Sequence, residues 1–162
     1  MKYLVLPLCI LVLLFSNCKT RNSDSGSSAS SIKVKKNEVQ WSETAAAASF
    51  NTKDSIISIL GNEANETFTI RFKRPALKEK IEKLEAYSTL SPTRLSASIS
   101  DKYQLDSTKT NKFEIRLIDN LKKRITGDFY LHLKRSKEYG GGVGETYIYQ
   151  GRFDVLYEEI SI

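Results

Sequence analysis

The sequence predicts an all-β domain, mainly antiparallel with one short helix, arranged either as a β-sandwich or as a half-open meander barrel. The first observation behind this prediction is the strict alternation of apolar and polar residues over 67–73. The second is the same alternation nearer the C-terminus, at 113–117, 129–133 and 153–157. The third is that only one phase of these segments is apolar, which is typical of an antiparallel sheet with one face in water.

Shorter apolar segments bring the expected number of strands to about eight or nine. They lie at residues 39–41, 46–50, 55–60, 95–99 and 145–149. Turn-forming residues separate the segments. They are Gly61-Asn62, Asp119-Asn120, the glycines at 140–142 and Gln150-Gly151.

One helix is expected at residues 75–84. Pro75 suits the first turn of a helix, and Leu77, Ile81 and Leu84 recur at the spacing of one helical face.

The alternation also assigns a core of large apolar side chains that should face a single interior. These side chains are Phe68, Ile70, Phe72, Phe113, Ile115, Leu117, Phe129, Leu131 and Phe153.

Residues 1–17 have the pattern of a signal peptide. Lys2 is basic, and the run 3–15 is apolar apart from Pro7. A spanning helix needs about 20 apolar residues, so this run is too short to cross a bilayer and fits a signal-peptide core. The run ends close to Cys18, whose position resembles the lipidation site of bacterial lipoproteins. We therefore expect cleavage before Cys18 and lipidation of its thiol, with an ordinary secretory signal or an uncut N-terminal anchor as the alternatives.

Residues 18–37 are expected to form the lipidated cysteine and a Ser-rich tether, and residues 38–162 the folded domain. Residues 19–31 include six Ser and no large apolar side chain, so they cannot build a core. Cys9 and Cys18 are the two cysteines of the chain, which leaves the domain without a thiol or a disulfide. The residue after Cys18 is Lys and not Asp, which resembles lipoproteins of the outer membrane. We expect the protein to face the periplasm.

No residue pattern nominates a catalytic group, a cofactor or a metal site. The chain has one His and no G-x-S-x-G motif. His132 lies on the polar phase of its strand, which favours a solvent-facing side chain. The Gly-rich residues 140–144 lack the following Lys of a phosphate-binding loop. The acidic residues Asp154, Glu158 and Glu159 indicate a solvated terminal strand more than a calcium site.

The charge balance favours acidic partners only mildly. Lys and Arg number 25 against 19 Asp and Glu, which gives a net charge of +6. Acidic residues are interspersed among the basic runs, which argues against nucleic acid. The basic run at 33–36 is either a solvated segment or lies against anionic lipid headgroups. Tyr147 and Tyr149 share one phase beside the Gly-rich residues and form a candidate ligand patch.

Three short motifs occur in an order that resembles an uncharacterised family of Bacteroidetes lipoproteins. They are Val39-Gln-Trp41, Ile125-Thr-Gly-Asp-Phe129 and Gly151-Arg-Phe153. The resemblance implies an all-β lipoprotein without catalytic residues.

These features lead us to expect a membrane-anchored, non-enzymatic binding or accessory protein of the cell envelope that needs no cofactor. Its partners would be the membrane, through Cys18, and an envelope protein or a small apolar ligand. The alternatives are a barrel carrier of a lipid or small apolar ligand, and a hydrolase or inhibitor acting on envelope polymers. A domain starting at Lys33 is expected to fold without lipid, metal or disulfide.

Overall fold

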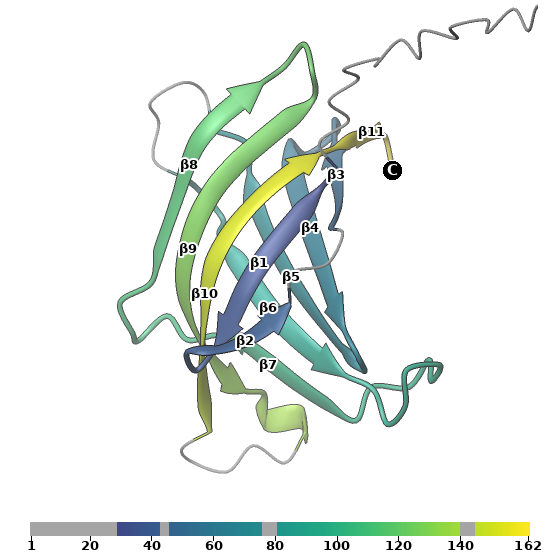
Figure 1. Cartoon of the computed structure of the whole chain (residues 1–162), viewed down its shortest axis with the longest axis vertical. Helices are drawn as coiled ribbons and strands as arrows, with labels where there is room; N and C mark the ends of the chain where they lie inside the picture. Colours follow the sequence, from purple (N-terminus) through teal and green to yellow (C-terminus); the bar gives the residue numbers. More distant parts are fainter. Residues whose placement is uncertain (1–28, 43–45, 76–80, 140–144) are drawn as a thin grey trace, which may run out of the picture.

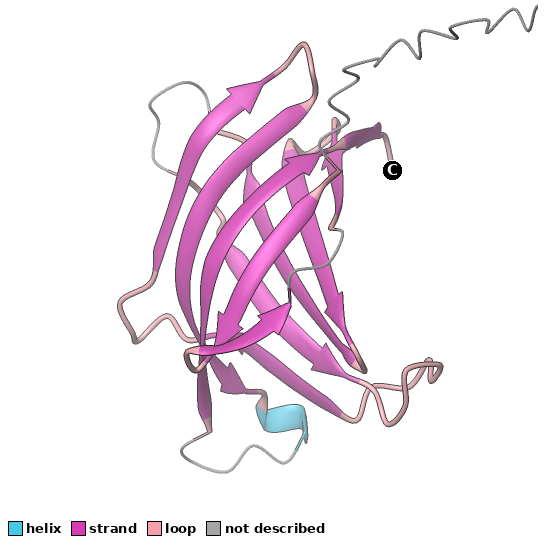
Figure 2. Ribbon diagram, in the orientation of Figure 1, coloured by secondary structure: helices cyan, strands magenta, loops and turns pink. Residues whose placement is uncertain are grey.

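Most of the residues that the structure describes lie in β-strands. The computed structural model describes residues 29–42, 46–75, 81–139 and 145–162 (Figures 1 and 2). The strands are β1 (Ser31–Lys36), β2 (Val39–Ser42), β3 (Ala47–Asn51), β4 (Ile56–Glu63), β5 (Glu66–Lys73), β6 (Glu85–Leu90), β7 (Asp101–Leu105), β8 (Lys112–Asp119), β9 (Arg124–Arg135), β10 (Thr146–Leu156) and β11 (Glu158–Ile160). The helical content of these residues is the 3₁₀ turn η1 (Lys137–Tyr139). In the same residues, no helix is long and apolar enough to cross a bilayer.

All eleven strands belong to one curved sheet. Its order is β11-β3-β4-β5-β6-β7-β9-β10-β1-β2, and β8 lies beside β9 off this path. The pairings are antiparallel except that of β11 with β3. The two ends of the path, β2 and β11, are not hydrogen-bonded to each other, so the sheet curls without closing (Figure 1). The all-β class is confirmed, with one open sheet in place of the two sheets of a sandwich.

The long strand β9 organises one side of the sheet. One of its edges pairs with β10 from Arg124 to Lys134. The other edge is divided between β8, which pairs with residues 124–130, and β7, which pairs with residues 133–135. The outer surface of β8, β9, β10 and β1 is therefore one continuous face.

The first strand lies within the segment predicted to be a tether. Ile32 and Val34 of β1 are buried in the interior. The Ser30 hydroxyl accepts a hydrogen bond from the backbone N–H of Leu156 at 2.8 Å. The folded domain therefore begins near residue 30 and not at residue 38, and a chain cut at Lys33 would lose the buried Ile32.

β10 continues without interruption through Gly151, where a turn was predicted. Gly151 lies opposite Phe129 of β9, and Gly127 of β9 lies opposite Phe153 of β10. A Cβ on Gly127 would stand 2.5 Å from Phe153 Cζ, and one on Gly151 would stand 3.2 Å from Phe129 Cζ. Each phenyl ring covers the glycine of the neighbouring strand, so both glycines permit close packing inside the sheet and neither forms a turn.

Two further elements differ from the prediction. Residues 95–99 belong to the loop before β7, and Leu95 is 96 % exposed. Residues 81–84, assigned to the predicted helix, are not helical, and residues 76–80 of that helix lie outside the described residues. The backbone N–H of Lys73 donates to the carbonyl of Glu82 at 3.0 Å, so this segment folds back beside the end of β5.

The predicted core is largely confirmed. Phe68, Ile70, Phe72, Phe129, Leu131 and Phe153 are buried, and Phe113 and Ile115 are packed against them. Leu117 is the exception, with 49 % of its surface exposed. The pairing of β8 with β9 shifts register between Ile115 and Leu117. This bulge reverses the phase of the strand, and Ile118 takes the inward position.

Candidate functional site

Glu66 is a carboxylate buried at the start of β5. It shares the inward phase of Phe68 and Ile70, and 8 % of its surface is exposed. A buried carboxylate is costly unless hydrogen bonds and an opposite charge compensate it. The surroundings of Glu66 supply both.

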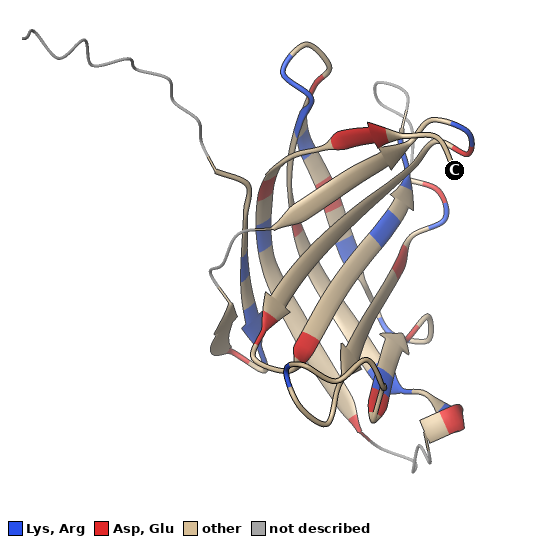
Figure 3. Ribbon diagram, turned by 90° about the vertical axis from the view of Figure 1, so that its right-hand side faces the viewer, with Lys and Arg blue, Asp and Glu red and all other residues tan. Residues whose placement is uncertain are grey.

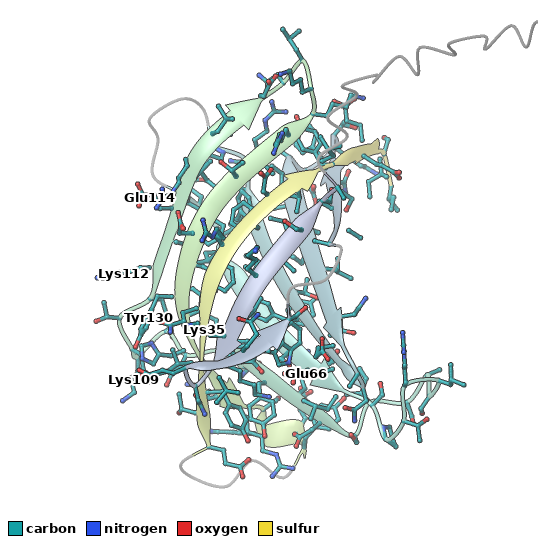
Figure 4. The ribbon with its side chains drawn as sticks, viewed as in Figure 1. Lys35, Glu66, Lys109, Lys112, Glu114 and Tyr130 are labelled. Atoms are coloured by element: carbon teal, nitrogen blue, oxygen red, sulfur yellow. The ribbon has the colours of Figure 1, made fainter. Side chains whose placement is uncertain are left out.

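Four side chains from four other strands donate to this carboxylate. Lys36 Nζ of β1 lies 3.0 Å from Oε1 and 2.9 Å from Oε2. Trp41 Nε1 of β2 lies 2.9 Å from Oε2. The hydroxyls of Ser88 on β6 and Tyr149 on β10 donate to Oε1. We call these five residues the Glu66 cluster; Figure 4 shows Glu66 beside β2.

Three tyrosine rings surround the Lys36 ammonium. Its Nζ lies 4.3 Å from the ring centroid of Tyr147, 5.4 Å from that of Tyr149 and 5.9 Å from that of Tyr103. These distances are within the range of cation–π attraction. The Tyr103 hydroxyl in turn donates to Glu145 Oε2 at 3.0 Å.

The protonation states of the cluster follow from these contacts. Burial raises the pKa of Glu66, but hydrogen bonds from Ser88, Tyr149 and Lys36 outweigh it and hold that pKa below its ordinary value. Burial and the charge of Glu66 raise the pKa of Tyr149. At neutral pH the carboxylate is ionised and the phenol is protonated, so neither group is poised for general acid–base exchange.

The cluster ties together two groups of strands, β1, β2 and β10 on one side and β5 and β6 on the other, that share no backbone hydrogen bonds with each other. β1 and β2 form one end of the sheet path, whereas β5 and β6 lie near its middle. Lys36 and Trp41 of the first part meet Glu66 of the second part on the inner side of the curled sheet. The role that the geometry gives to the cluster is to hold the curled sheet together.

The candidate ligand patch of Tyr147 and Tyr149 belongs to this interior. Tyr149 is 0 % exposed, and its ring stacks on that of Phe68 at 4.7 Å between centroids. Tyr147 is half-buried and contacts Tyr103 and Lys36. Their ring faces are therefore turned to other side chains of the protein, so the pair does not form an open surface patch.

The other residues singled out in the sequence do not lie together at one site. His132 lies on the outer phase of β9 with its ring edge-on to Tyr130, and its Nδ1 has no hydrogen-bond partner among the described residues. Asp154 is paired with Arg124, and Glu159 with Lys123. Cys18 and residues 140–144 lie outside the described residues.

Metal removal and reduction are expected to leave the melting temperature unchanged. In the part of the chain that the structure describes, no group of three or more His, Cys, Asp and Glu side chains is arranged to hold a metal ion. The chain contains no Cys after Cys18, so a reductant has no bond to break within the domain. Thermal unfolding with and without EDTA, and with and without dithiothreitol, measures this. A shift of several degrees with EDTA would contradict it.

A basic groove lies on the outer face of β1, β10, β9 and β8. Its volume is about 700 Å³, within the usual range for ligand sites of ~300–1,000 Å³. The side chains along it are Lys33, Lys35, Gln40, Arg116, Asp128, Tyr130, Gln150 and Arg152. Four of these side chains are cationic, and the one carboxylate, Asp128, is paired with Arg116. Figure 4 shows Lys35, Tyr130 and Lys112 following one another across this side of the molecule.

No protein-family model, curated protein or solved structure matches this chain. The resemblance to a family of Bacteroidetes lipoproteins therefore remains a prediction.

Sequence reasoning missed both Glu66 and the groove. Glu66 could have been noticed, because it continues the inward phase of Phe68, Ile70 and Phe72 and is an acidic residue on an apolar phase. The groove left no comparable signal. Its cations come from three separate strands and meet only through the sheet register.

Proposed function

We propose that this protein is a lipid-anchored, non-enzymatic binding or accessory protein of the bacterial cell envelope, located at the outer membrane and facing the periplasm. The anchor is Cys18, which follows the apolar run 3–15. Residues 19–30 then separate it from β1, which starts at Ser31. A coil of that length reaches roughly 20 Å.

The observation that carries the binding role is the basic groove. It combines the cations Lys35 and Arg152 with the amide of Gln150 and the ring of Tyr130 on one rigid sheet. The packing of the interior also favours a ligand site on the outer face. Inside the curled sheet, the ring of Phe68 packs against those of Tyr149 and Phe129. Those rings occupy the place where a carrier would hold an apolar ligand.

Replacing Cys18 by Ala is expected to abolish fatty-acid labelling and to release the protein from its membrane attachment, because the one other cysteine, Cys9, lies within the proposed signal peptide. Metabolic labelling with a fatty acid, followed by fractionation of the cells, measures both effects. The matched control is Cys9→Ala, which alters the other cysteine and should leave the labelling intact. Unchanged labelling of the Cys18→Ala chain would exclude the proposed anchor.

A further inference from the structure

The alternation of β1 divides the basic run 33–36 between two environments. Lys36 points inward to Glu66, whereas Lys33 and Lys35 point outward, on the phase opposite to the buried Ile32 and Val34. The two outward lysines are the first charged side chains of the sheet. Figure 3 shows the basic positions along this first strand.

The sheet register extends this charge across the neighbouring strands. Lys33 lies directly opposite Arg152 of β10, and Lys35 lies opposite Gln150. Gln150 lies opposite Tyr130 of β9, and Tyr130 opposite Lys112 of β8. Since neighbouring strands are ~4.8 Å apart, the row from Lys35 to Lys112 spans about 14 Å. We call Lys33, Lys35, Lys112, Arg116 and Arg152 the basic face.

Three cations of the basic face, Lys35, Lys112 and Arg152, are not neutralised by the acidic groups of the described residues. Asp128 is paired with Arg116, and Asp154 is paired with Arg124 at 2.6 Å. Glu114 is exposed on β8 between Lys112 and Arg116, and it is one carboxylate among the five cations of this face. Lys35, Lys112 and Arg152 have no ion pair within the described residues, so their charge is available to an external anion.

We propose that the basic face docks the domain onto the anionic phosphate headgroups of the same bilayer that holds the anchor. This inference rests on the proposed anchoring through Cys18. The residues between Cys18 and Ser31, even fully extended, span at most ~45 Å, so the anchor keeps β1 and its outward lysines close to the headgroups. A broad, multiply charged surface fits cations spread over the three strands β1, β10 and β8 better than one small anion does. Each basic residue at an anionic membrane surface strengthens attachment by about fivefold.

The test uses the full-length lipidated chain, reconstituted in vesicles of phosphatidylcholine with or without phosphatidylglycerol. The mature chain has no Cys beyond Cys18, so a nitroxide can be placed at a single introduced cysteine. Gln150→Cys reports from the centre of the basic face. Ser58→Cys, on the outward phase of β4, reports from a distant strand. A nickel-chelating lipid in the vesicle relaxes a nitroxide that lies near the headgroups.

The expected result is strong relaxation of the Gln150 probe on anionic vesicles, and several-fold weaker relaxation on neutral vesicles or in 1 M salt, where the screening length is about 3 Å. The Ser58 probe should respond weakly in every case. Replacing both Lys35 and Arg152 by Gln should reduce the Gln150 signal several-fold. The control variant, Lys53→Gln together with Lys137→Gln, removes the same charge from other exposed sites. It should leave the signal of the Gln150 probe unchanged.

The outcomes separate the two proposals. If the chain floats with the vesicles but the Gln150 probe is insensitive to phosphatidylglycerol, or the Lys35/Arg152 variant behaves as the Lys53/Lys137 variant does, the docking inference is overturned and the anchor stands. If the chain does not float with the vesicles and carries no fatty acid, the anchoring proposal fails and the docking inference fails with it.

Discussion

Replacing Glu66 by Gln should lower the free energy of unfolding by about 3–5 kcal/mol, the usual cost of removing one partner from a buried ion pair. The amide keeps the size of the side chain but not its charge or its second acceptor oxygen. Lys36 and Trp41 both donate hydrogen bonds to Oε2. An amide nitrogen at that position is itself a donor and could not accept either bond. Urea unfolding of the full chain and the variant, followed by the fluorescence of Trp41, measures the difference.

The control for this variant is Glu85→Gln, which removes an exposed carboxylate that pairs with Arg71 at 3.4 Å. An exposed pair of this kind contributes about 0–1 kcal/mol.

The dependence of stability on acid provides a second measurement of the role of Glu66. Because the pKa of Glu66 is lowered by folding, its contribution is present at neutral pH and is lost as the pH falls below 4.5, its ordinary value, through the folded pKa. The Glu66→Gln variant should lose less stability over this interval than the unmodified protein. Equal costs for the Glu66 and Glu85 variants would contradict the structural role of the cluster.

Replacing Phe129 by Ala should cost about 3–5 kcal/mol, the range for emptying a buried phenyl site. Phe129 is 4 % exposed, packs 5.6 Å from Phe68 between ring centroids and covers Gly151. Truncation would leave a cavity beside Gly151, which has no side chain of its own to fill the space. The midpoint concentration of denaturant, multiplied by the dependence of the free energy of unfolding on denaturant concentration, gives that free energy for each protein.

The comparison for Phe129 is its neighbour Tyr130, which is half-buried on the outer phase of the same strand. Tyr130→Ala should cost much less, because its ring lies on the outer surface against His132. Similar unfolding midpoints for the two variants would show that the inward phase of β9 has been misassigned.

The alternation of apolar and polar residues was enough to place most strands, since burial on one face leaves its period in the sequence. β5 and the inward side chains Phe129 and Phe153 were found in this way. β7 was missed because in Asp101–Leu105 one side chain, Tyr103, is fully buried. β10 was divided in two because a glycine inside a strand looks like a turn until the ring opposite it is known.

The pairing of distant segments could not be deduced from local patterns. The Glu66 cluster joins residues 22, 25, 30 and 83 positions apart in the chain. No short motif connects such residues. The same holds for Arg152, which meets Lys33 only because β1 and β10 are neighbours.

The pairing of the first strand with one of the last also governs when folding can finish. Asn37 and Ile148 are hydrogen-bonded across a sequence separation of 111 residues, and Ser30 and Leu156 across 126. Contacts between residues so far apart in the sequence form slowly, because a long loop must close before these contacts can stabilise the fold. The N-terminal hairpin therefore cannot dock until nearly the whole chain has been synthesised. Under the export that we propose for this protein, the delay would keep the chain unfolded until its C-terminal strands had crossed the membrane.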